Sequence, residues 1–137
     1  MSEDQTEPLA DEALARLTIY TNQGSAEELA EQIGAVPDES WNTGDLNRHD
    51  RPLTSTAISF RSQLAAQASP SEHLADLIAR IEPLKESLRV AVENGCTARL
   101  KLAVFADTDN AAFMLPADLL RRVGSLGFDL SLDVYDV

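Results

Sequence analysis

The chain has 137 residues, a length that suits one domain with one hydrophobic core. It is 44% hydrophobic, which excludes a disordered tail, and no stretch reaches the roughly 18 consecutive apolar residues of a membrane span. Lys and Arg total 11 against 23 Asp and Glu, so the formal net charge is −12. This charge disfavours binding to nucleic acid or anionic membranes. It either attracts a basic partner or serves solubility alone, and solubility is the simpler interpretation.

The first residues of the chain and its single cysteine limit the possible domain organisation and location of the protein. Residues 1–11 are acidic and polar, so we expect a flexible leader there and a single α/β domain over residues 12–137. The leader lacks the basic and apolar regions of a secretory signal, so we expect a cytoplasmic protein. Cys96 is the only cysteine, which excludes an intramolecular disulfide and a cysteine-based zinc site. We expect no cofactor and no metal.

Alternation and capping signals define the first elements. Alternating side chains predict a strand over residues 14–21, with Leu17 and Ile19 on its apolar face. A capping box that begins at Ser25 predicts a helix, and Gly34 predicts its end.

A long polar loop is expected over residues 37–52, which show no periodicity, before a second strand over residues 54–62. The loop holds the only tryptophan, Trp41. This side chain either anchors the loop on the core or projects as an interface residue, and we favour the anchor.

A long helix follows. A capping box at Ser69 predicts its start and Gly95 its end. The apolar stripe keeps its phase across Pro83, which predicts one kinked helix or two nearly collinear helices. His73 lies in the first turn, where we expect solvent exposure.

The remaining elements are a strand over residues 97–106, a short helix after Pro116 and a closing strand over residues 128–135. Three of the four strands have one apolar and one polar face, unlike strands that are covered on both sides. The sequence therefore predicts an α+β fold with two layers: a mixed four-stranded sheet with helices on one face and solvent on the other.

The polar faces of the last two strands are candidates for a binding surface. Asp129, Asp133 and Tyr135 share one face of the closing strand, while Arg99 and Lys101 share the polar face of the strand before it. Cross-strand ion pairing is the simpler interpretation, and a binding face is the functional one. The candidate partner- or ligand-binding residues are Trp41, Asp45, Tyr20, Asp129, Asp133 and Tyr135.

Several short motifs follow one another along the chain: Leu17-Thr18-Ile19-Tyr20, Glu27-Glu28-Leu29, Val36-Pro37, Gly44-Asp45, Leu77-Ile78, Pro83, Leu119-Leu120, Gly127 and the closing run 129–135. In this order the chain resembles the bacterial domain-of-unknown-function family numbered 4279, over residues 14–135. The resemblance implies a small bacterial α/β protein. It implies no activity and no catalytic residues.

Four functions fit these observations. The first is a non-enzymatic protein-interaction domain, such as an immunity or inhibitor protein against a basic toxin. The second is a small-molecule-binding or regulatory domain with a pocket under the 37–53 loop. The third is an enzyme that uses Asp45, His49 and Asp50, and the fourth is a homodimer formed through the sheet. We favour the first.

Overall fold

The computed structural model describes residues 12–106 and 113–136. They form an α+β fold with a mixed, open sheet, so the expected fold class is confirmed. The leader expected at residues 1–11 lies outside the described residues. The elements in chain order are β1 (Glu12–Thr21), α1 (Ala26–Ile33), β2 (Glu39–Trp41), β3 (Thr56–Arg61), α2 (Pro70–Ile81), the 3-10 helix η1 (Glu82–Leu84), α3 (Lys85–Glu93), β4 (Thr97–Ala106), α4 (Ala117–Leu126) and β5 (Leu130–Asp136).

The sheet has five strands in the order β2-β3-β1-β4-β5, not the four that the sequence predicts. The additional strand, β2, was expected to be loop because three residues are too short to show an alternation. All neighbouring strands are antiparallel except β4 and β5, which are parallel. The long strands β1 and β4 lie at the centre, where they pair over nine residues from Glu12↔Phe105 to Tyr20↔Thr97.

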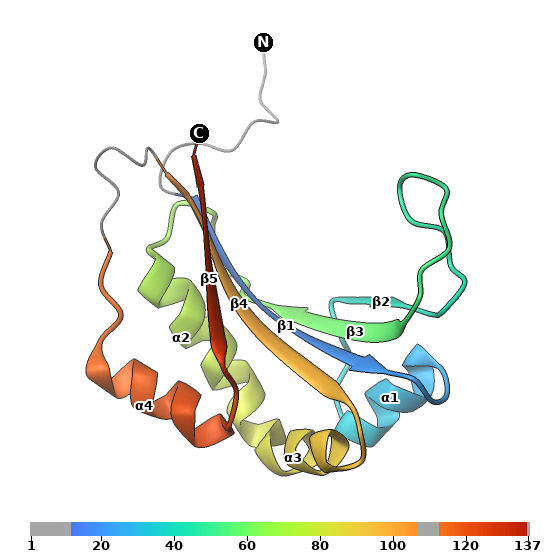
Figure 1. Ribbon diagram of the computed structural model, residues 1–137. Helices are drawn as coiled ribbons and strands as arrows, with labels where there is room; N and C mark the ends of the chain where they lie inside the picture. The colour runs from blue at the N-terminus through green and yellow to red at the C-terminus, as the bar shows by residue number, and fades with distance from the viewer. Residues whose placement is uncertain (1–11, 107–112, 137) are drawn as a thin grey trace.

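The core lies between one face of the sheet and the helices. On β1 the side chains of Ala15, Leu17 and Ile19 are fully buried, as the alternation predicts. Apolar residues of all four α-helices join the same cluster. Figure 1 shows α2, α3 and α4 along one side of the curved sheet, with α1 near the β3 end. The opposite side of the central strands is left open.

The long helix is interrupted at Pro83, where α2 passes through η1 into α3. The capping box at Ser69 begins α2 as predicted, with the Ser69 hydroxyl accepting a hydrogen bond from the Glu72 N–H. Leu77 of α2 and Leu88 of α3 are both buried, so the apolar stripe keeps its phase across the break. Of the two alternatives, the pair of successive helices is correct.

His73 is buried, so the expected solvent exposure is wrong. Its Nδ1 accepts a hydrogen bond from the Ser62 hydroxyl at 2.7 Å, and its Nε2 donates to the Ala65 carbonyl at 2.9 Å. The Ser62 oxygen in turn accepts from the Ala15 N–H at 3.1 Å. The first turn of α2 faces the segment after β3, which covers the ring, and this tertiary contact is not visible in the local sequence. Of the helices in the part of the chain that the structure describes, none is long and apolar enough to cross a membrane.

Candidate functional site

The open face of the sheet carries polar and basic side chains in cross-strand rows. Residues that pair directly across neighbouring strands point to the same face. Arg16 of β1 is opposite Arg61 of β3 on one side and opposite Lys101 of β4 on the other. Three basic residues on three neighbouring strands therefore form a line, which we call the basic row.

The next row toward the end of β1 holds one cation, Arg99, and one carboxylate, Glu39, which is opposite Ser59. Thr18 is opposite Ser59 on one side and Arg99 on the other, and the Thr18 and Ser59 hydroxyl oxygens lie 3.4 Å apart. Arg99 lies two residues before Lys101, on the same face of β4. The open face thus holds four of the 11 basic residues of a chain whose net charge is −12.

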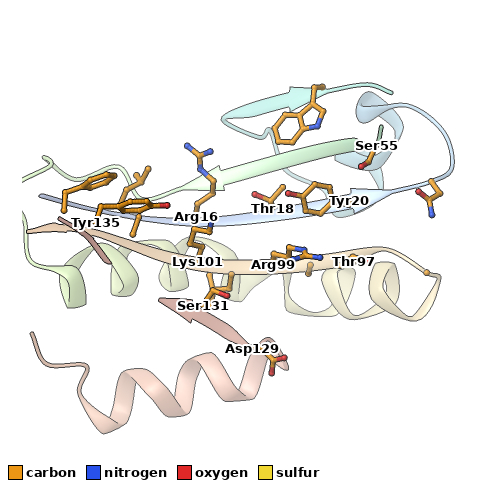
Figure 2. Close-up of a pocket in the computed structure, with 18 residues that line it drawn as sticks. Arg16, Thr18, Tyr20, Ser55, Thr97, Arg99, Lys101, Asp129, Ser131 and Tyr135 are labelled. Carbon is orange, nitrogen blue, oxygen red and sulfur yellow. The ribbon is translucent and has the colours of Figure 1, made fainter. Parts of the chain in front are cut away.

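A groove of about 1070 Å³ runs along this face and is lined mainly by β1, β4 and β5. We call it the sheet groove. Figure 2 shows Arg16, Thr18 and Tyr20 standing along β1 and Lys101, Arg99 and Thr97 along β4. Along β4 it extends from Thr97 to Phe105, about 26 Å of extended chain. Its charged lining residues are Arg16, Arg99, Lys101 and Asp129.

Aromatic side chains line both ends of the sheet groove. At one end the rings of Phe105 and Tyr135 stack, with centroids 4.8 Å apart and an interplanar angle of 14°. At the other end lie Tyr20 and Trp41, which occupy one cross-strand row through Ala57. The basic residues lie between these two ends.

Two cations of the basic row already contact carboxylates. An Arg16 guanidinium nitrogen lies 3.2 Å from Glu39, which reaches across from β2, and Lys101 Nζ lies 3.0 Å from Asp133 of β5. The hydrogen bond from Lys101 lowers the pKa of Asp133 below its ordinary value. Both pairs are well exposed, so each contributes little to stability and can exchange its carboxylate.

Arg99 is the cation of the sheet groove that has no ion pair with any described residue. Its guanidinium lies over the ring of Tyr20, 6.0 Å from the centroid. This contact positions the guanidinium without using its hydrogen-bond donors, so they remain available to a ligand.

A family model, described as a domain of unknown function (DUF4279), matches residues 11–137, nearly the whole chain. The chain belongs to the DUF4279 family. The resemblance noted in the sequence is therefore confirmed. Comparisons with curated proteins and with solved structures gave no match.

The structure brings most of the predicted site residues of this DUF4279 protein together. Four of them, Trp41, Tyr20, Asp129 and Tyr135, line the sheet groove. Asp133 contacts Lys101 and accepts a hydrogen bond from the Tyr135 hydroxyl at 3.3 Å. The cross-strand ion pairing expected between the last two strands is thus present.

Asp45 is separate from the other predicted residues. It is exposed in the connection between β2 and β3, where its carboxylate accepts a hydrogen bond from the Asn42 N–H at 2.7 Å. Trp41 is half-buried and lies on β2, so it is not a loop residue, and it opens on the groove. The choice between an anchor and an interface residue stays a prediction.

The residues of the proposed acid–base loop are also outside the groove. His49 is exposed, and its Nε2 accepts a hydrogen bond from Arg48 at 3.3 Å, while Asp50 is exposed at a turn with φ of 59°. In the part of the DUF4279 chain that the structure describes, there is no group of three or more His, Cys, Asp or Glu side chains that could hold a metal ion.

Sequence reasoning missed three residues of the open face. Arg16 and Phe105 line the sheet groove, and Arg61 is opposite Arg16 in the basic row, but none of the three was selected as a candidate. Alternation could place each of them on a strand face. Their assembly in one site depends on the cross-strand register, which the sequence of this DUF4279 protein does not display.

Proposed function

We propose that this DUF4279 protein is a non-enzymatic protein-interaction domain that binds its partner in the sheet groove. The observation that supports the proposal is the arrangement of the open face: aromatic side chains at both ends of a groove and cations between them. Tyrosine, tryptophan and arginine are the residues that most often dominate binding energy at protein interfaces.

The composition of the sheet groove favours binding over catalysis. Its described lining residues include hydroxyl groups but neither histidine nor cysteine, and Asp129 is the one carboxylate among them. A hydroxyl nucleophile needs a base within hydrogen-bond reach. Among the described side-chain hydrogen bonds of these residues, only the Tyr135 hydroxyl meets a carboxylate, and that carboxylate, Asp133, is already paired with Lys101.

The shape of the groove favours a polypeptide over a small molecule. A site for a small ligand encloses most of the ligand and is mostly apolar. The sheet groove is open along about 26 Å of β4, and charged and hydroxyl side chains line it together with apolar ones. The predicted pocket under the 37–53 loop has little support, since Trp41 is the one residue of that range that lines the groove.

The other predicted partners remain predictions. A basic toxin would find its complementary charge on the acidic surface outside the groove, because the basic row would repel it. Homodimer formation through the sheet would bring two basic rows or two strongly acidic molecules together. Neither partner gains support from a particular contact in the structure.

Affinity capture with a matched pair of variants tests the proposal. Tyr135→Ala removes one ring of the stacked pair in the groove, and Leu120→Ala removes a similarly exposed apolar side chain on α4 (43% and 46% exposed). The tagged wild type and both variants are used as baits in a lysate of the source cells, and captured proteins are quantified by mass spectrometry. We expect a protein that the wild type and Leu120→Ala retain and that Tyr135→Ala loses by roughly tenfold, the scale of one interface aromatic.

Equal capture of every protein by all three baits would sink the proposal, because a partner in the groove must contact the Phe105–Tyr135 end. Circular dichroism and the midpoint of urea unfolding, measured on each bait, exclude loss of fold as the cause of a difference.

A further inference from the structure

We infer that the occupant of the sheet groove is an extended, acidic segment of the partner protein, whose carboxylates pair with Arg99 and the basic row. This inference rests on the proposed function and adds the chemistry of the partner.

The first argument is the like-charge register of the basic row. Arg16 has a cation directly opposite on both sides, Arg61 and Lys101. Like charges opposite one another destabilise a sheet. Four of the 11 basic residues of the chain lie on this one polar face. Glu39 and Asp133 offset part of this repulsion, and a bound anion would reduce the remainder.

The second argument comes from the carboxylates that now occupy the row. Glu39 approaches Arg16 from β2, across β3, and Asp133 approaches Lys101 from the neighbouring strand β5. They show that a carboxylate fits at each cation at ion-pair distance. Because both pairs are exposed, an incoming carboxylate can replace them or add to them at little cost.

The third argument is the spacing along β4. Arg99 and Lys101 lie two residues apart on one strand face, about 6.6 Å between their Cα atoms. An extended peptide repeats its side chains on one face at the same spacing. A segment that runs along β4 with acidic residues at alternate positions therefore places one carboxylate near each cation. A segment of about eight residues would span the groove and reach the rings of Tyr20 and Tyr135 at its ends.

The charge of the rest of the molecule argues against a nucleic acid in the same groove. A polynucleotide carries a phosphate at every residue, and it would approach a chain of net charge −12. Asp129 in the groove wall, together with Glu39 and Asp133 beside it, would face several of these phosphates. A peptide with alternate acidic residues presents fewer charges and places neutral side chains between them.

Fluorescence anisotropy with a defined probe tests the inference. The probe is a labelled peptide of about eight residues in which glutamate alternates with serine, and the matched probe has glutamine in place of each glutamate. We expect the wild type to bind the glutamate peptide at least about tenfold more tightly than the glutamine peptide, the sum of several exposed ion pairs. The preference should fall as salt rises from about 20 mM to about 300 mM, because exposed pairs are screened.

Charge variants assign the binding to the groove. Arg99→Gln and Lys101→Gln should each weaken binding of the glutamate peptide by roughly two- to fivefold, and Arg99→Lys should restore part of it. Arg121→Gln is the matched control, since Arg121 is an exposed arginine of α4 that pairs with Asp118. This control should leave the affinity unchanged.

Two outcomes would overturn the inference: equal affinity for the glutamate and glutamine peptides, or a loss with Arg121→Gln equal to the loss with Arg99→Gln. Tighter binding of an oligothymidylate of matched charge would also overturn it, in favour of a nucleic acid. If capture from lysate depends on Tyr135 while the acidic peptide shows no preference, the acidic chemistry is wrong and the groove remains the binding site. If capture is independent of Tyr135, the proposed function itself falls.

Discussion

The Asp38 carboxylate joins the start of β2 to β3 and α2. It accepts hydrogen bonds from the Arg61 N–H and the Gln63 amide, both at 2.8 Å, and from the Arg80 guanidinium. Burial alone raises the pKa of Asp38, but the hydrogen bonds from Arg80 and Arg61 outweigh it, so the pKa lies below its ordinary value. The charged form of Asp38 therefore holds the edge of the sheet next to the groove.

Replacement of Asp38 by asparagine tests this role. We expect Asp38→Asn to lower the free energy of unfolding at neutral pH by about 1–2 kcal/mol, since charge-assisted hydrogen bonds are lost. Because the folded-state pKa is lowered, the contribution is present above the ordinary Asp pKa of about 3.9 and is lost as pH falls through the folded-state value. Urea unfolding at a series of pH values should show the wild type and variant converging in acid. A constant difference down to about pH 2 would contradict the assignment. Asp118→Asn, on exposed α4, is the control and should change little.

The buried His73 ring is a second point where one side chain holds several segments. Its two nitrogens, with Ser62, form a continuous chain of hydrogen bonds from the Ala15 N–H to the Ala65 carbonyl. We expect His73→Ala to lower the free energy of unfolding by about 2–4 kcal/mol, because the change leaves the buried Ser62 O–H without an acceptor and opens a cavity. Chemical unfolding measures the difference. His49→Ala removes the other, exposed histidine and should cost less than about 0.5 kcal/mol; equal effects would refute the role of His73.

The start of α2 depends on a local motif. Ser69 accepts a hydrogen bond from the Glu72 N–H at 3.2 Å, and Glu72 returns one to the Ser69 N–H at 2.9 Å. We expect Ser69→Ala to lower the free energy of unfolding by about 1 kcal/mol, while Ser69→Asp, which keeps a capping oxygen, retains most of it. Thermal or urea unfolding of the three proteins checks the order. An aspartate variant as unstable as the alanine variant would show that the cap is not the cause.

The elements that local rules control were predicted from the sequence. The capping boxes at Ser25 and Ser69, and the alternation of β1 and β4, act within one element, so their signals are visible in a short window. Two features depend on partners far along the chain. The short β2 exists because it pairs with β3, and His73 is buried because the segment after β3 covers it. The residues next to β2 or His73 in the sequence do not reveal these distant contacts.

The candidate site was predicted in part, for the same reason. Tyr20, Trp41, Asp129 and Tyr135 were selected for residue type and strand face, and the fold brings them to one groove. The basic row was not predicted because it depends on register. Arg16 pairs with a residue 45 positions away and another 85 positions away, and a shift of either strand by one residue would turn the partner to the opposite face.

Across the whole molecule, charge is divided between the groove and the remaining surface. The chain as a whole carries a charge of −12, yet the charged lining of the sheet groove consists of three cations and one carboxylate. Long-range repulsion keeps such molecules apart from acidic partners, while the groove attracts an acidic segment at close range. Salt screens both effects, and because the exposed ion pairs in the groove carry the selectivity, the preference for an acidic segment should fall as salt rises.

The basic row should also reduce the stability of the free protein, and Arg61→Gln tests this cost. Arg61 is exposed and opposite Arg16, so its removal relieves a like-charge contact. We expect the free energy of unfolding to rise by about 0.2–1 kcal/mol at low salt and by almost nothing at about 0.5 M salt, where the repulsion is screened. Arg121→Gln makes the same change in net charge but removes a favourable pair with Asp118, so it should not stabilise. Two results would refute this explanation: an Arg61→Gln variant that is less stable than the wild type, or a gain in stability that persists at high salt. Since the same variant removes a cation of the row, it should bind the acidic peptide more weakly, so the stability gained in the free protein is lost in the complex.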